Sequence, residues 1–275
     1  MCGRYVIVET VEQIEKRFNV EASAVQLKMN YNLSVGQLGP VITNQAPKQL
    51  QLFQFGLTPS WSQKQMYLFN ARSEGDHNKD EDPNYKGGKG IIEKPSFRKP
   101  IRSQRCLVIA SAFIEGPKDE GLSKPYLVYL QNHKRPFAMA GIWDTWKKPE
   151  TGEEVNSFSI ITTTANELLQ KIGHHRMPVI LDQEDEMTWL NSNAELSLIT
   201  GLLGQYPAKL MNAYPISPEI KSIKNNSKEL LQPIGERIFP EFEAKTSTTI
   251  ELRGFGSGKH RTKETNVWGE PPLES

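Results

Sequence analysis

A succession of short apolar segments, separated by turn residues and only rarely by helical patterns, most constrains how this chain can fold. Leu50-Gln-Leu-Phe-Gln-Phe55 alternates apolar and polar residues, which is typical of a half-buried strand. We predict strands at 5–8, in two parts of 41–55, and at 106–112, 126–131, 137–143 and 158–163. We predict helices only at 10–18, 165–171, 182–190 and 194–203, the first with the capping-box spacing Thr10-Val-Glu-Gln13. Because strands and helices do not alternate regularly, the sequence predicts an α+β fold: one β-rich domain of mainly antiparallel strands with a few short helices.

The predicted domain spans residues 2–240 of the 275 in the chain, a length that can build one substantial core. Residues 75–94 are polar, acidic at first and then rich in Gly and Lys, and predict a surface insertion. Residues 241–275 are rich in Lys, Thr, Gly, Ser and Glu, and predict a disordered C-terminal tail.

Net charge and cysteine content limit the classes of function. A formal net charge of +1 gives no long-range positive field, so DNA contacts must come from local basic clusters such as the run 97–105. No apolar run has the length of a membrane span, and the N-terminus does not resemble a signal peptide. Cys2 and Cys106 fit a reducing compartment, and Cys106 lies in an apolar segment that predicts a packed core thiol. We therefore expect no membrane association, and a cytoplasmic, nucleoid-associated protein in a bacterium or a nuclear one in a eukaryote.

Cys2 is the candidate nucleophile. It follows an initiator methionine, and its side chain is small enough for aminopeptidases to remove Met1. The chain would then begin with a thiol and a free α-amine on adjacent carbons. Such an aminothiol can condense with an aldehyde to an imine and then close a thiazolidine ring. The alternative from the N-terminus alone is that Cys2 has no chemical role.

Three further motifs place polar side chains at the ends of apolar segments. Asn70-Ala-Arg72 follows an apolar pair, Ser111-Ala-Phe-Ile-Glu115 ends a predicted strand in a carboxylate, and His174-His-Arg-Met-Pro178 joins two imidazoles and a guanidinium. Taken singly, each has an ordinary interpretation: Asn70 as a turn residue, Glu115 as a surface acid and His174 as a solvated loop residue.

Together these motifs resemble the SRAP family, whose members covalently capture abasic sites in single-stranded DNA. The matching stretches are Cys2-Gly-Arg4, Tyr31-Asn32, Gly56-Leu-Thr-Pro-Ser-Trp61, Asn70-Ala-Arg72, Glu115, His174-His-Arg-Met-Pro178 and a closing segment at 223–233. They occur in the family's order from residue 2 to about residue 235. The sequence departs from the family pattern at three informative positions: Phe55 and Gly116 stand where the family has Trp, and Gly173 is an extra residue.

The resemblance implies that the protein senses abasic sites in single-stranded DNA, crosslinks to them through Cys2 once Met1 is removed, and protects the lesion during the DNA-damage (SOS) response. It implies Cys2, Asn70, Glu115 and His174 as catalytic residues, with His175 as the alternative imidazole. It implies DNA binding by Arg4, Asn32, Trp61, Arg72, Thr162 and Arg176. It implies neither a cofactor nor a metal. We expect a monomer, with replication or repair proteins as further partners, and an abasic-site lyase side activity.

Three rival functions stay open at this stage. The strongest is a cysteine peptidase, acting on itself to release Met1 or a longer leader, with Cys2 as nucleophile, His174 as base and Asn70 as orienting residue. A metal site built from Cys2, His174 and His175 is the second. A single-strand binder without catalysis is the third.

Overall fold

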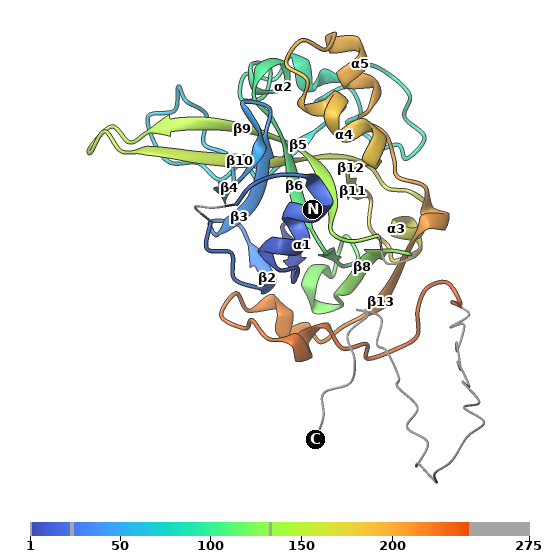
Figure 1. Cartoon of the computed structure of the whole chain (residues 1–275). Coiled ribbons are helices and arrows are strands. Elements are labelled where there is room, and N and C mark those ends of the chain that lie inside the picture. Colours follow the sequence, from blue (N-terminus) through green and yellow to red (C-terminus); the bar gives the residue numbers. More distant parts are fainter. Residues whose placement is uncertain (1, 23–24, 132–133, 242–275) are drawn as a thin grey trace, which may run out of the picture. The chain divides into compact units, whose positions relative to one another are not determined.

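The computed structural model describes residues 2–22, 25–131 and 134–241 (Figure 1). Within these residues the structure is β-rich, with mainly antiparallel strands and a few short helices, so the predicted fold class is confirmed. One compact unit extends as far as Ile238. The predicted tail at 241–275 lies outside the described residues except for Glu241. None of the helices in the described part of the chain is long and apolar enough to cross a membrane.

The larger sheet has eight strands. They are β3 (Leu38–Thr43), β4 (Ala46–Phe55), β5 (Asn70–Arg72), β6 (Arg105–Ala110), β9 (Phe137–Lys147), β10 (Glu154–Thr164), β11 (Arg176–Pro178) and β12 (Ile180–Leu181). Strand β10 pairs with both β4 and β9, so the pairing β4–β3–β6–β9–β10 closes on itself as a barrel. Only β10–β4 and β10–β5 are parallel pairs. Figure 1 shows β9 and β10 running on together as a long hairpin beyond their neighbours.

The smaller sheet is antiparallel throughout. Its five strands, in spatial order, are β13 (Met211–Pro215), β8 (Tyr126–Leu130), β7 (Ala112–Glu115), β1 (Arg4–Ile7) and β2 (Asn30–Ser34). Strands β7 and β1 each pair on both sides, so β7, which ends at Glu115, and β1, which begins two residues after Cys2, are held within the sheet.

The apolar run that predicted one strand at 106–112 forms two strands, which is a correction to the sequence analysis. The break is at Ser111, where the chain leaves β6 of the larger sheet and enters β7 of the smaller one. The Ser111 hydroxyl accepts a hydrogen bond from the Val8 N–H at 2.9 Å and donates to the Glu9 carboxylate. These bonds satisfy polar groups that the change of sheet would otherwise bury without partners. Hydrophobicity alone cannot reveal such a transfer, because both strands are buried.

Helices are short and cover the strands. They are α1 (Val11–Phe18), α2 (Pro100–Ser103), α3 (Glu167–Lys171), α4 (Gln183–Leu190) and α5 (Leu196–Gly201), with 3₁₀ turns η1 (Gly90–Ile92), η2 (Gly121–Ser123), η3 (Ala208–Leu210), η4 (Pro218–Lys221) and η5 (Lys228–Leu231). The predicted capping box of α1 is confirmed, because Thr10 and Gln13 bond each other's backbone N–H. Asp182 occupies the N-cap position of α4 but makes no side-chain bond to that helix.

Aromatic rings fill the space where the N-terminal strand meets the barrel. Phe55 is fully buried and stacks on Phe158 at 5.2 Å between ring centroids, while Tyr5 packs edge-on against it. Phe55, which stands where the family has Trp, therefore lies in the core and not on a surface that could stack with bases. Cys106 is fully buried, so its predicted role as a packed core thiol is confirmed.

The basic run 97–105 is not a continuous surface of positive charge. Arg105 is 1% exposed, and its guanidinium donates to the backbone carbonyls of Ile101, Arg102, Trp189 and Asn191. These bonds join α2 to the end of α4. Arg105 therefore stabilises the fold from within, and the predicted DNA contact from this part of the run is corrected.

Candidate active site

The register of the smaller sheet brings the N-terminus to Glu115. Strand β1 pairs with β7 so that Tyr5 lies opposite Phe113. Continuing that antiparallel register places the segment 2–3 opposite the segment 115–116. Cys2 and Glu115 are buried together, 2% and 3% exposed, and the Cys2 thiol lies within electrostatic reach of the Glu115 carboxylate. Met1 lies outside the described residues.

This environment keeps the Cys2 thiol neutral. Burial, and then the charge and hydrogen bond of the neighbouring Glu115 carboxylate, raise the pKa of the Cys2 thiol well above its usual value. A cysteine peptidase needs the opposite, a thiolate stabilised by a lowered pKa. The Cys2 thiol therefore keeps its proton in the resting protein.

A helix C-cap positions His174. Helix α3 ends in a Schellman motif, in which the Gly173 N–H bonds the Gln170 carbonyl and the His174 N–H bonds the Leu169 carbonyl, both at 2.9 Å. Gly173 has φ +77°, a left-handed conformation that favours glycine. The extra residue that sequence comparison finds before the histidine motif is thus the glycine that turns the chain toward Glu115.

His174 contacts Glu115 through Nε2. His174 Nδ1 lies 2.7 Å from the Arg176 carbonyl oxygen, and because that oxygen can only accept, Nδ1 carries a hydrogen. His174 Nε2 lies 3.2 Å from Glu115 Oε2, with both side chains buried. This distance is short enough for a proton to pass between the two side chains. Burial lowers the pKa of His174, although the Glu115 charge acts in the opposite direction.

Asn70 holds the N-terminal segment from the larger sheet. It lies on β5, beside Ile160 of β10. Its Nδ2 donates to the Cys2 carbonyl at 3.1 Å and to the Phe69 carbonyl at 3.0 Å. Asn70 Oδ1 is buried and has no hydrogen-bond partner among the residues that the structure describes. A buried acceptor without a donor is rare, and it suits an incoming N–H or O–H group.

A pocket of about 190 Å³ opens beside these groups. Its lining includes Arg4, Phe69, Glu115, Gly116, Lys118, His174 and His175. A side chain at Gly116 would collide with the backbone of Gly121, since a Cβ there would lie 1.9 Å from the Gly121 oxygen. The departure from the family's Trp at this position thus leaves room for the chain at 121 to form the pocket wall.

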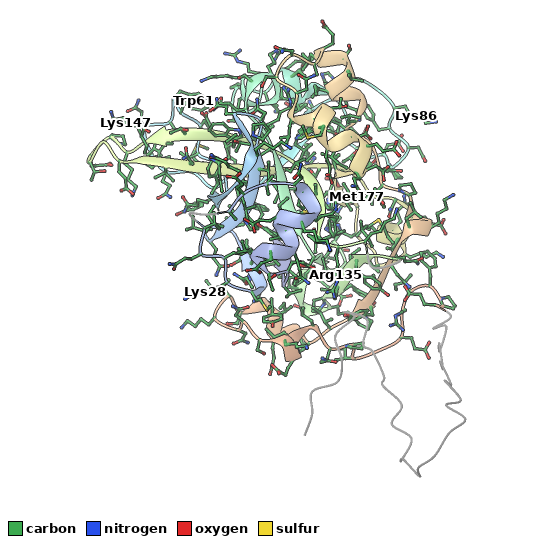
Figure 2. All side chains as sticks on the ribbon, in the orientation of Figure 1. Lys28, Trp61, Lys86, Arg135, Lys147 and Met177 are labelled. Carbon is green, nitrogen blue, oxygen red and sulfur yellow. The ribbon has the colours of Figure 1, made fainter. Side chains whose placement is uncertain are left out.

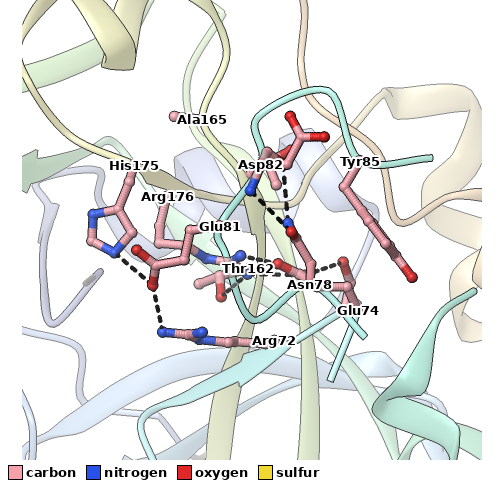
Figure 3. A network of polar contacts seen from close by, with 12 residues as sticks. Arg72, Glu74, Asn78, Glu81, Asp82, Tyr85, Thr162, Ala165, His175 and Arg176 are labelled. Carbon is pink, nitrogen blue, oxygen red and sulfur yellow. Dashed lines mark hydrogen bonds and ion pairs between the residues drawn. The ribbon is translucent and has the colours of Figure 1, made fainter. Parts of the chain in front are cut away.

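Arg176 and Thr162, both predicted to bind DNA, lie inside the protein (Figure 3). The Arg176 guanidinium forms an ion pair with both carboxylate oxygens of Glu74, and its Nη2 also donates to the Thr162 hydroxyl at 3.1 Å. Each of the three side chains is at most 2% exposed. In this conformation the Arg176 Nη groups are engaged by the protein itself and fix β11 against β10 and the segment after β5.

Asn32, a third predicted DNA contact, joins the closing segment to the site. It is 1% exposed, and its Nδ2 donates to the backbone carbonyls of Ile220, Ser222 and Asn225. Its Oδ1 accepts a hydrogen bond from Arg4 Nη1 at 2.9 Å. Asn32 is therefore placed to orient Arg4, which lines the pocket.

The remaining predicted DNA contacts reach solvent. The Arg72 side chain is 38% exposed and lies on the same face of β5 as Asn70, because alternate residues of a strand share a face. Trp61 is 58% exposed (Figure 2). Of the six residues predicted to bind DNA, three are buried: Asn32, Thr162 and Arg176. The other three can contact a ligand directly: Trp61 and Arg72 at the surface and Arg4 at the pocket.

Sequence analysis missed three residues near the site: Glu74, Glu81 and Lys118. Glu74 pairs with Arg176, and Glu81 pairs with Lys118, Arg72 and His175. All these partners except Arg72 are distant in sequence. The one available signal was a run of charged residues immediately after Asn70-Ala-Arg72, which indicates exposure more often than pairing.

Glu74→Gln is expected to lower the free energy of unfolding by about 3–5 kcal/mol, because Arg176 would keep a buried charge without its carboxylate partner. Urea-induced unfolding followed by tryptophan fluorescence measures this loss. Glu93→Gln is the matched control, since Glu93 is an exposed carboxylate that pairs with His77, and it should change stability by less than about 1 kcal/mol. Equal losses in the two variants would contradict a stabilising role for the buried pair.

The residues of the proposed metal alternative diverge. His174 faces Glu115 and His175 faces Glu81. Among the residues that the structure describes, no group of three or more His, Cys, Asp or Glu side chains is arranged to hold a metal ion.

Comparison with known proteins identifies the family. The model of the SOS response associated peptidase (SRAP) family matches residues 1–223. Abasic site processing protein YoqW of Bacillus subtilis is 34% identical over 240 residues, covering 84% of this chain and 99% of YoqW. Abasic site processing protein HMCES of Gallus gallus is 29% identical over 257 residues, covering 81% of this chain and 71% of HMCES. The crystal structure of a Bacteroides thetaiotaomicron protein is 30% identical and superposes with a TM-score of 0.72, covering 84% of this chain and 99% of that one. The order of motifs, the fold and these matches agree, and the chain belongs to the SRAP family.

Proposed function

We propose that this protein captures abasic sites in single-stranded DNA by forming a thiazolidine with Cys2, once Met1 has been removed. The observation that carries the proposal is the chain of contacts from the Cys2 thiol to Glu115 and from Glu115 to His174. That chain supplies a neutral thiol with a buried group that can take its proton. The similarity to proteins named for abasic site processing supports DNA with abasic sites as the substrate.

The reaction proceeds without oxidation or reduction. The Cys2 α-amine attacks C1′ of the ring-opened sugar, and loss of one water leaves a C=N imine. The thiol sulfur then bonds to the same carbon, while the thiol proton is transferred to the nitrogen. The product is a five-membered ring that joins protein to DNA, with the mass of both partners minus one water.

Glu115 and His174 act as the proton-transfer pair. Glu115 takes the thiol proton as sulfur closes on the imine, and His174 exchanges a proton with Glu115 through Nε2. The same groups help to open the sugar and to expel water. Asn70 holds the Cys2 carbonyl, and its unpartnered Oδ1 accepts a hydrogen bond from the amine or the sugar. The imine is also the intermediate from which β-elimination would cleave the strand, so a lyase side reaction is expected.

The contacts favour this chemistry over a Cys–His–Asn peptidase. In that alternative Asn70 would orient His174, but Asn70 donates to the Cys2 and Phe69 carbonyls. The raised pKa of the Cys2 thiol also disfavours a resting thiolate. Blocking the α-amine of Cys2 would separate the two functions, since thiazolidine formation needs the amine and thiol-dependent proteolysis does not.

Intact-mass analysis tests the proposal directly. The purified protein is weighed before and after mixing with a single-stranded oligonucleotide that carries one abasic site. We expect a starting mass without Met1 and an adduct equal to protein plus DNA minus one water. If protein that lacks Met1 forms no adduct, the proposed capture is refuted. A monomeric state, a cytoplasmic or nuclear location and replication or repair partners stay predictions.

A further inference from the structure

The carboxylate of Glu81 lies among three nitrogen donors next to the active-site pocket, and Figure 3 shows two of them, Arg72 and His175. Lys118 Nζ lies 2.7 Å from Glu81 Oε2, and Arg72 Nη2 lies 3.0 Å from Glu81 Oε1. His175 Nε2 lies 3.4 Å from the same Oε1. Lys118 and His175 also line the pocket. We call Arg72, Lys118 and His175 the rim donors.

The rim donors have the composition of an anion site. Arg72 and Lys118 are positively charged, and burial lowers the pKa of His175 to about 4, so its neutral ring offers Nε2–H as a hydrogen-bond donor. His175 Nδ1 is buried and has no hydrogen-bond partner in the described part of the chain, which agrees with that tautomer. The Arg72 and Lys118 side chains are 38% and 56% exposed, whereas Glu81 is only 17% exposed. The cations therefore remain reachable from solvent while the carboxylate is held between them.

Glu81 lies in a turn that is held by side-chain hydrogen bonds. It lies in the polar segment 75–94 and has φ +57°, an uncommon left-handed conformation for a non-glycine residue. The Asn78 side chain closes this turn by bonding both the N–H and the carbonyl of Asp82. Gln205 anchors the next residue by donating to the Pro83 carbonyl at 3.0 Å. The backbone thus holds the Glu81 carboxylate at the rim donors from outside the sheets.

We propose that Glu81 occupies a phosphate subsite for single-stranded DNA and must be displaced when DNA binds. The inference rests on the proposed function and adds that Glu81 competes with a DNA phosphate for the rim donors. A carboxylate and a phosphodiester both accept hydrogen bonds from guanidinium and ammonium groups, so one can replace the other. Because two of the rim donors, Lys118 and His175, line the pocket, the phosphate concerned is one next to the abasic nucleotide. Glu81 therefore weakens binding of DNA that does not carry enough further contacts to displace it.

The test measures reversible binding of a fluorescent single-stranded oligonucleotide with one tetrahydrofuran residue, an abasic analogue that has no aldehyde and cannot crosslink. Glu81→Gln is expected to bind it about three- to tenfold more tightly than the unmodified protein. Glu93→Gln removes the same charge from the same segment, away from the rim donors, and is expected to bind as the unmodified protein does. An equal gain in both variants, or no gain in Glu81→Gln, would overturn the inference.

Two further measurements locate the effect. Lys118→Gln should weaken binding more in the Glu81→Gln background than in the unmodified protein, where Glu81 already engages Lys118. An uncharged methylphosphonate in place of a phosphate next to the tetrahydrofuran should abolish the gain from Glu81→Gln. Additive effects of the two substitutions, or a gain that survives every such replacement, would contradict a phosphate subsite. Crosslinking is read separately by intact mass, so a protein that captures DNA while Glu81→Gln binds no better would refute only this inference.

Discussion

Cys2→Ser is expected to leave no stable adduct with abasic DNA, at least about a hundredfold less than the unmodified protein. Serine is as small as cysteine, so Met1 removal and the α-amine are retained. The amine can still form an imine, but a hydroxyl does not close a ring of comparable stability. Intact mass after a fixed reaction time measures the loss. Adding borohydride, which reduces an imine to a stable amine, should restore an adduct with Cys2→Ser.

The matched control is Cys106→Ala. Cys106 is the other thiol of the chain and is fully buried in the core, so its removal should leave capture unchanged. A stable adduct with Cys2→Ser in the absence of borohydride would show that an imine or another bond is the final link. Loss of the adduct with Cys106→Ala in a folded protein would show that the assignment to Cys2 is wrong.

Local sequence rules predicted the parts of the fold that neighbouring residues determine. The capping box of Thr10 and Gln13 starts α1 where the spacing places it. Gly173, noted in the sequence only as an extra residue, is the left-handed glycine that ends α3 and directs His174. In both cases the interacting groups lie within five residues of one another, so the pattern contains the physical cause.

Long-range pairing could not be predicted in the same way. The change of sheet at Ser111 depends on Val8 and Glu9, which lie about a hundred residues earlier. Which arginine a ligand can reach depends on burial, and Arg176 is buried in an ion pair with Glu74, which lies in the segment after β5. A motif thus predicts which residue types lie at a site. Which of them are buried and support the fold, and which are exposed to a ligand, is known only from the three-dimensional contacts.

The candidate site was predicted in part from the sequence, and its contacts required the structure. Cys2, Glu115, His174 and Asn70 were predicted as a group from their resemblance to a family, and their contacts now give each a physical partner. Whether His174 or His175 faces Glu115 was open in the sequence, because adjacent imidazoles are chemically equivalent. The contact of His174 with Glu115 and of His175 with Glu81 distinguishes them.

Glu115→Gln is expected to slow adduct formation by about 10²–10⁴-fold. The amide has nearly the same shape as the carboxylate but cannot take the Cys2 proton or share one with His174. Single-turnover rates, followed by denaturing gel electrophoresis of the DNA, measure the effect. Glu120→Gln is the control, because Glu120 is a carboxylate on the neighbouring loop that pairs with Lys124 at the surface. It should capture DNA at the unmodified rate.

Glu115→Gln is expected to make the Cys2 thiol more acidic while it slows capture. This variant therefore distinguishes two mechanisms. The Glu115 charge and hydrogen bond help to raise the thiol pKa, so Glu115→Gln should lower it toward its usual value and increase the thiolate fraction at neutral pH. The pH dependence of iodoacetamide labelling at Cys2 measures that change. If a resting thiolate limited capture, Glu115→Gln would react faster than the unmodified protein. A slower reaction with a more acidic thiol would instead show that Glu115 contributes by moving protons in the transition state, whereas an unchanged rate would remove Glu115 from the mechanism.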